Sequence, residues 1–265
     1  MRMNVKRAAG AAVLGLMALM QGGCTVKEET VCERVINYMS ERYGDSFTCP
    51  VCYTGYPGSP VQEYFMDAEK LDGAEIKVEV RSPGTPEERY LDNYMGIKYR
   101  RECKEKIEDV LTDAFSCRRA DLIVMPDSAE RGLSNHWTPE TSLDEYCTDP
   151  AAGLAFHAVI RSGEDFSDSK VRWEMEHRLE DLLFLSHICC TGWIYFVPAG
   201  VDLKAINEGS FFDLVLKHNY FDARLFFNMK TAEGVDSFAW KGDGIEEEVT
   251  APVTETGTAA ADGND

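Results

Sequence analysis

Two cysteines spaced as a thiol pair are the first residues whose types and spacing could do chemistry. Cys49 and Cys52 form a C-x-x-C sequence, the spacing of dithiol redox sites and of half of a zinc site. A redox pair of this kind lies at a helix N-terminus, but the turn residues 54–58 follow here and do not begin a helix. A zinc site needs a second pair, which the adjacent Cys189 and Cys190 do not supply. Structural thiols are the favoured interpretation, and a redox or metal role is the alternative.

A second candidate lies on a predicted helix. Glu174 and His177 form a Glu-x-x-His sequence, with Asp181 one turn further on. A di-iron centre needs two such helices and further carboxylates, whereas this sequence offers one. The H-E-x-x-H sequence of zinc peptidases is absent. We therefore predict an ordinary exposed helix face here, with no metal and no cofactor.

The remaining chemical signals are a polar loop and a set of aromatic residues. His136 and Trp137, with Asp144 and Glu145 nearby, could line a pocket, because loops often carry functional side chains. Aromatic residues of the second half could form a ligand box, although their spacings favour a core: Trp173, Trp193, Phe196, Phe211, Phe212 and Phe226. The sequence has no G-x-S-x-G, P-loop or Rossmann glycine pattern, so neither a serine hydrolase nor a nucleotide enzyme is indicated.

The N-terminus has the pattern of a secretory signal peptide. Residues 2–7 contain three basic side chains and no acidic one, and residues 8–20 carry no charge. These 13 residues span about 20 Å as a helix, less than a hydrocarbon core of about 30 Å. A basic start, a short apolar run and small residues at the end predict removal of residues 1–23 after Gly23. A short uncleaved anchor is the alternative.

Cys24 directly follows Gly22 and Gly23, and this arrangement resembles the lipobox of bacterial lipoproteins. The resemblance covers four residues and departs from the usual pattern at Gln21, where Leu is common. It implies that the Cys24 thiol takes a diacylglycerol and becomes the new N-terminus. Two acyl chains, at about 0.8 kcal/mol per buried CH₂, anchor a protein stably. We therefore predict a lipid-anchored protein on the outer side of the cell membrane, with residues 24–29 as a tether.

The chain is strongly acidic. It has 46 Asp and Glu against 27 Lys and Arg, a formal net charge of −19, and removal of residues 1–23 takes away three further positive charges. Such a body repels phosphate backbones, so nucleic-acid binding is not predicted. It also disfavours direct contact with anionic lipid, which leaves the anchor as the membrane contact. No protein or small-molecule partner is indicated.

Eight cysteines remain beyond Cys24. An even number in an exported chain suggests disulfides, while Cys is also a residue type that is often buried as a free thiol. Both interpretations stay open for Cys32, Cys49, Cys52, Cys103, Cys117, Cys147, Cys189 and Cys190.

Local patterns predict alternating helices and strands. Helices are predicted over 31–43, 92–115, 168–186 and 211–218, and strands over 46–53, 61–69, 74–81, 122–125, 153–161, 189–197 and 224–229. The residues from Tyr38-Met39 through Tyr43-Gly44 to Phe47 look like those of uncharacterised small lipoproteins of Gram-positive anaerobes, with Arg42 in place of the usual Lys. This resemblance covers about residues 30–115 and implies an α+β fold with no assigned activity.

These elements predict an α+β protein with helices packed on a mainly antiparallel sheet. Residues 30–126 form an N-terminal part and 151–244 a C-terminal part, either as two small halves or around one shared sheet. Residues 127–150 contain prolines and little periodicity and are predicted to be a linker or long loop. Residues 245–265 carry six acidic and no basic side chains, which predicts a disordered tail.

The expected function is that of an exported, membrane-anchored lipoprotein without enzymatic activity, which binds a ligand or partner or supports the envelope. The alternative is a membrane-tethered thiol-redox or metal-dependent enzyme that uses Cys49 and Cys52.

Overall fold

The computed structural model describes most of the chain beyond the N-terminus. The described residues are 30–53, 59–127, 133–207, 209–211, 213, 221–229, 234–242 and 245–250, without the side chains of 50–53 and 246–250. The predicted signal peptide (1–23), the tether with Cys24 (24–29) and residues 251–265 lie outside them. No helix in this described part is long and apolar enough to cross a membrane.

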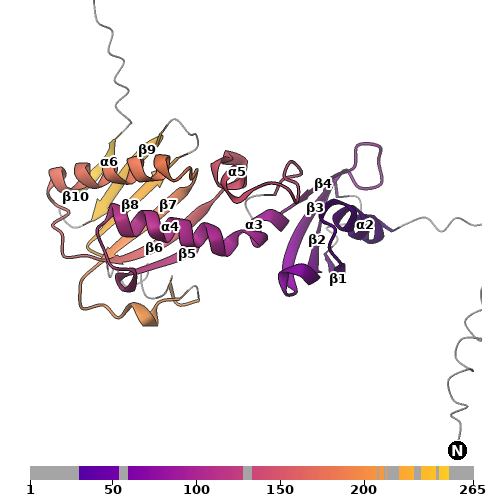
Figure 1. Ribbon diagram of the computed structural model, residues 1–265, viewed down its shortest axis with the longest axis horizontal. Coiled ribbons are helices and arrows are strands. Elements are labelled where there is room, and N and C mark those ends of the chain that lie inside the picture. The colour runs from indigo at the N-terminus through magenta and orange to yellow at the C-terminus, as the bar shows by residue number, and fades with distance from the viewer. Residues whose placement is uncertain are drawn as a thin grey trace, which may run out of the picture.

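Helices and strands alternate along the chain (Figure 1). The helices are α2 (Val31–Tyr43), α3 (Tyr94–Lys98), α4 (Arg100–Ala114), α5 (Leu143–Thr148) and α6 (Ser169–Leu185). The strands are β1 (Phe47–Tyr53), β2 (Val61–Ala68), β3 (Ala74–Arg81), β4 (Arg89–Asp92), β5 (Leu122–Pro126), β6 (Ala155–Arg161), β7 (Thr191–Val197), β8 (Ala223–Asn228), β9 (Ser237–Gly242) and β10 (Ile245–Thr250). Single 3-10 turns cover Glu69–Leu71, Arg119–Asp121, Pro150–Ala152 and Leu203–Ala205.

The first sheet is an antiparallel meander in the order β1-β2-β3-β4. Its buried face follows from the alternation in β3, where Ile76, Val78 and Val80 are buried. Helix α2 packs against the same core through a stripe that includes Val35 and Met39. The helix has the predicted bounds because local signals set both ends: a capping box at its start and a left-handed glycine at its end.

The second sheet has the order β10-β9-β8-β7-β6-β5. All its pairs are antiparallel except β6 and β7, which run parallel because α6 crosses over between them. Helices α4 and α6 lie side by side on one face (Figure 1) and enclose the largest core. A smaller cluster covers the other face, with Leu203, Ile206 and Phe211 from the segment after β7. Helices on two mostly antiparallel sheets confirm the predicted α+β class.

Helix α4 belongs to both cores, which corrects the predicted boundary at residue 126. Cys103 near its start is part of the first core, whereas Ile107, Val110 and Leu111 are part of the second. Strand β5 also belongs to the second sheet, because it pairs with β6. The two cores therefore meet along α4.

The predicted linker, residues 127–150, is anchored to the first core by part of its described segment, 133–150. Trp137, Tyr146 and Cys147 are buried in the first core, and α5 begins with a capping box between Ser142 and Glu145. The sequence showed no periodicity here because α5 has only 6 residues. The predicted tail also begins later than residue 245, because Ile245–Thr250 pairs with β9 as strand β10.

Candidate functional site

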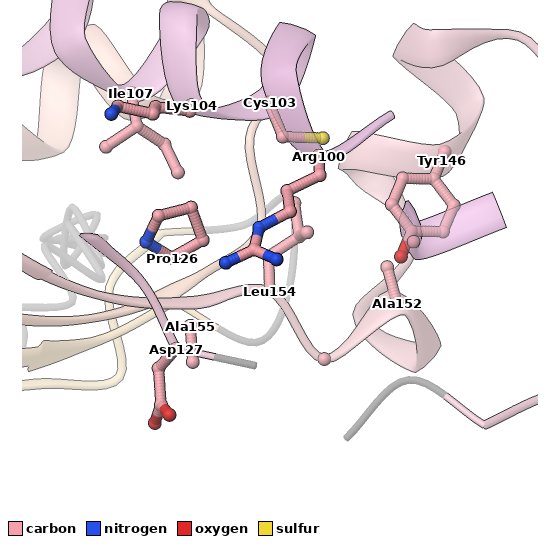
Figure 2. A pocket seen from close by; sticks show the side chains of 12 residues that line it. Arg100, Cys103, Lys104, Ile107, Pro126, Asp127, Tyr146, Ala152, Leu154 and Ala155 are labelled. Atoms are coloured by element: carbon pink, nitrogen blue, oxygen red, sulfur yellow. The ribbon is translucent and has the colours of Figure 1, made fainter. Parts of the chain in front are cut away.

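A small cavity lies where the two cores meet. It has a volume of about 40 Å³ and is bounded by the start of α4, the end of β5, α5 and the segment before β6. Figure 2 shows Ile107 and Cys103 on the helix side, Pro126 and Asp127 on the strand side, and Arg100 extending between them. The other lining residues are Gly96, Lys104, Tyr146, Ala152, Gly153, Leu154 and Ala155. The walls are mainly apolar, and Arg100, Lys104 and Asp127 contribute the charged groups.

An open depression of about 510 Å³ adjoins this cavity and shares Arg100, Lys104 and Pro126 with it. Its lining also includes Lys98, Arg101 and Glu102, so residues 98–104 place four cations and one carboxylate here. Lys98 donates a 3.1 Å hydrogen bond to the Pro139 carbonyl. In a chain with a net charge of −19, this depression is a local concentration of positive charge.

Two of these cations make only loose ion pairs with their own helix. The Lys104 ammonium lies 3.7 Å from Glu108, and the Arg101 guanidinium lies 3.8 Å from Glu105. The Arg101 side chain is 80% exposed. Exposed pairs of this kind contribute at most about 1 kcal/mol each, so both side chains can reorient toward an anion at little cost.

The predicted thiol pair lies elsewhere, in strand β1 at the edge of the first sheet. Cys49 lies within a register shift of the β1–β2 pairing, between Thr48 and Val51, and Cys52 lies beyond it opposite Tyr64 of β2. Because they lie in a strand, no helix dipole acts on them as in a thioredoxin-like site. The half-buried Cys49 packs against the first core, and the side chain of Cys52 lies outside the described residues.

The loop with His136 and Trp137 lines an open pocket of about 330 Å³, together with Glu145 and Asp149. Its polar groups make contacts that fix the loop. The Asp149 carboxylate lies 2.6 Å from His136 Nε2 and accepts a 3.1 Å hydrogen bond from Trp137 Nε1. Glu145 serves the capping box of α5, and Asp144 turns away to pair with Lys106 at 2.6 Å. The loop is held in place as part of the structure.

The Glu-x-x-His residues lie on the outer face of α6. Glu174, His177 and Asp181 are all exposed, and His177 Nδ1 lies 2.9 Å from the Trp173 carbonyl. Across the described part of the chain, no group of three or more His, Cys, Asp and Glu side chains could hold a metal ion.

The aromatic residues divide between both faces of the second sheet. Phe196 lies in the large core and Phe211 in the small one. Trp193 stacks on His157 with ring centroids 4.9 Å apart and also contacts Phe226. Trp173 is 56% exposed, and Phe212 lies outside the described residues. The described aromatic residues therefore do not line one common ligand-binding pocket.

The cavity and the adjoining depression together form the junction between the two cores. Sequence reasoning missed its residues, above all Arg100, Lys104 and Asp127. The available signal was the concentration of basic residues over 98–104 in an otherwise acidic chain. Nothing local indicated that this segment would meet residues 126–127 and 146–155.

A buried carboxylate lies at the end of β4. Asp92 is 1% exposed, and its Oδ1 accepts hydrogen bonds from the Tyr43 hydroxyl (2.8 Å) and the Tyr94 amide (3.0 Å). Within the described structure, its Oδ2 has no hydrogen-bond partner. Burial raises the pKa of Asp92 from 3.8 to about 6, although the two hydrogen bonds and the charge of Arg42 oppose the shift.

We expect this carboxyl to make the protein less stable as the pH rises from about 4 to 7. The folded state binds the proton more tightly than the unfolded state, so the contribution of Asp92 is lost as the pH passes its folded pKa. Asp92→Asn keeps the Oδ1 acceptor and removes the charge. The free energy of unfolding of the variant minus that of the wild type should therefore increase by about 2 kcal/mol between pH 4 and pH 7. Urea unfolding at several pH values measures the difference, and parallel curves for the two proteins would contradict it.

No protein-family model and no curated protein matches this chain. It is similar to the crystal structure of a DUF5037 family protein from Ruminococcus gnavus, with 12% sequence identity and a TM-score of 0.37. The match covers 77% of this chain and 94% of that chain. A likeness at this level assigns no function.

Proposed function

We propose that this protein is an exported lipoprotein, anchored through Cys24, whose folded body is a non-enzymatic binding module for a small anionic ligand. The observation that carries the proposal is the group of cations around the cavity where the two cores meet and in the depression that adjoins it. Arg100 and Lys104 belong to both the cavity and the open depression, so a ligand on these side chains would contact both.

The chemistry of the junction supports a carboxylate- or phosphate-bearing molecule. A guanidinium binds either group through two parallel hydrogen bonds, and an ammonium adds a point charge. The cavity beside them has apolar walls from Ile107, Leu154 and Ala155. Its volume of about 40 Å³ fits only a short apolar end of the ligand.

Binding is tested by calorimetric titration of the purified protein with inorganic phosphate and, separately, with butyrate. We expect saturable binding of at least one anion, and weaker binding when NaCl is added, because salt screens exposed charges. Arg100→Ala/Lys104→Ala should lower the affinity by about tenfold or more, a loss of at least about 1.4 kcal/mol. The matched control is Arg119→Ala/Lys170→Ala, which removes two exposed cations outside the junction. Equal affinities in both double variants, or no saturable binding of either anion, would refute the ligand proposal.

The anchor has its own test. Cys24→Ser should move the protein from the membrane fraction to the soluble fraction and abolish labelling by a palmitate analogue, because the acylated thiol is lost. Cys117→Ser, which removes a half-buried thiol at the end of α4, should leave both unchanged. Full retention of the Cys24→Ser protein in the membrane would show that lipid on Cys24 is not the anchor.

A further inference from the structure

Two buried thiols face each other between α4 and α5. Cys103 lies in the first turn of α4 and Cys147 near the end of α5, and their Sγ atoms are 3.5 Å apart. The residues are 6% and 1% exposed. A disulfide bond is about 2.05 Å long, so the two sulfurs must approach by about 1.5 Å, within the reach of side-chain rotation.

The cavity gives one of these thiols an approach from solvent. Cys103 lines the cavity, and Figure 2 shows its sulfur on the side of Tyr146, the neighbour of Cys147 in the chain. The cavity adjoins the open depression through Arg100 and Lys104. Cys189 and Cys190 are also buried but do not belong to the cavity lining.

The 3.5 Å contact lets Cys147 act as the base for Cys103. The hydrogen bond from Cys103 lowers the pKa of Cys147, and the charge of Lys106 lowers it further. The same hydrogen bond and burial raise the pKa of Cys103. Cys103, the sulfur that faces the cavity, therefore reacts as its proton passes to the Cys147 sulfur.

We propose that Cys103 and Cys147 are a site of reversible disulfide formation by exchange with a low-molecular-weight disulfide. The Cys103 sulfur attacks one sulfur of the incoming disulfide as its proton passes to the Cys147 thiolate, and the S–S bond breaks and releases a first thiolate. That thiolate takes the proton from Cys147. The Cys147 thiolate then attacks the sulfur of Cys103, forms the protein disulfide and releases a second thiolate, which takes a proton from water. The thiol–thiolate pair loses two electrons and one proton, water supplies the second proton, and the incoming disulfide is reduced to two thiols.

The bond would join residues 44 positions apart and tie α4 to α5, where the two cores meet. Closing a loop of this length restricts the unfolded chain, so we expect the midpoint of thermal unfolding to rise by about 5–10 °C. This inference goes beyond the proposed function and does not depend on ligand binding.

The test incubates the folded protein with 2-hydroxyethyl disulfide, a small neutral disulfide suited to a cavity of about 40 Å³. Remaining thiols are then blocked, and linked peptides are identified by mass spectrometry without reduction. We expect a Cys103–Cys147 peptide pair that dithiothreitol separates. In Cys147→Ala, the second step is impossible, so the 2-hydroxyethylthio group should remain on Cys103. The matched control Cys189→Ala, another buried thiol, should still form the Cys103–Cys147 bond.

Two results on the wild-type protein would overturn the proposal, so it does not depend on the folding of any variant. One is that Cys103 and Cys147 both remain free after incubation with excess 2-hydroxyethyl disulfide. The other is that Cys103 pairs with a different cysteine. Cys147→Ser, checked by circular dichroism, provides a second variant if Cys147→Ala does not fold.

Discussion

Gly192→Ala should lower the free energy of unfolding by about 3 kcal/mol, the upper end of the usual range for overpacking. Gly192 lies in β7 between Phe156 of β6 and Phe227 of β8. A Cβ atom there would lie 2.2 Å from Phe227 Cε1 and 2.7 Å from Phe156 Cζ. Both phenyl rings are fully buried. An alanine therefore requires two core rings and the strands that carry them to move.

Chemical denaturation followed by circular dichroism measures this loss. The matched control is Gly163→Ala, where a Cβ meets nothing within 4 Å, and it should stay within about 0.5 kcal/mol of wild type. Gly192→Ala/Phe227→Ala makes space for the new methyl group. It should cost at least about 1 kcal/mol less than the sum of the single variants. A Gly192→Ala protein as stable as the control would mean that the rings can move freely.

Glu176→Ala should cost about 3 kcal/mol, because it removes the acceptor of a buried indole. Trp240 is 1% exposed, and its Nε1 donates a 2.6 Å hydrogen bond to the Glu176 carboxylate, which is itself buried. An unpaired buried N–H group costs about 1–3 kcal/mol, and loss of the side chain adds a cavity. Glu176→Gln retains an oxygen acceptor and should cost about 1 kcal/mol.

The same helix offers the control. Glu174 is exposed two positions earlier and makes only a 3.7 Å ion pair with Lys170, so Glu174→Ala should change stability by less than about 0.5 kcal/mol. A double-mutant cycle with Glu176→Ala and Trp240→Phe should give a coupling of about 1 kcal/mol or more. Additive effects would show that the hydrogen bond does not stabilise the fold.

Local signals were enough to predict several elements closely. Helix α2 follows from Thr30, Glu33 and Gly44, whose capping contacts span only a few residues. The alternation in β3 and the strand at β8 were also visible in the sequence. The predicted helix over 92–115 is divided at Tyr99 into α3 and α4, and β4, β9 and β10 were not predicted. Most of the helix predicted over 211–218 lies outside the described residues. For β10, partner pairing outweighs the low strand propensity of its three glutamates.

Burial on α6 shows the limit of reasoning from residue type. Its periodicity predicted an apolar inner face, which Leu179 and Leu183 occupy. Arg172 and Glu176 are buried there as well, because Trp240 and the Phe166 carbonyl need hydrogen-bond partners. A polar residue on an inner face becomes predictable only once its partner, 64 positions away for Glu176, is known.

By itself, the sequence determined the α+β class, the bounds of α2 and the acidic character of the chain, because caps, alternation and composition act over short distances. It also contains the N-terminal pattern on which the proposal of export and a lipid anchor rests, and these residues lie outside the described structure. Only the tertiary structure brought Arg100 and Lys104 to a cavity beside Asp127, and Cys103 to Cys147. These groups are separated by 20 residues or more in the chain, and the packing of two cores along one helix decides their contact.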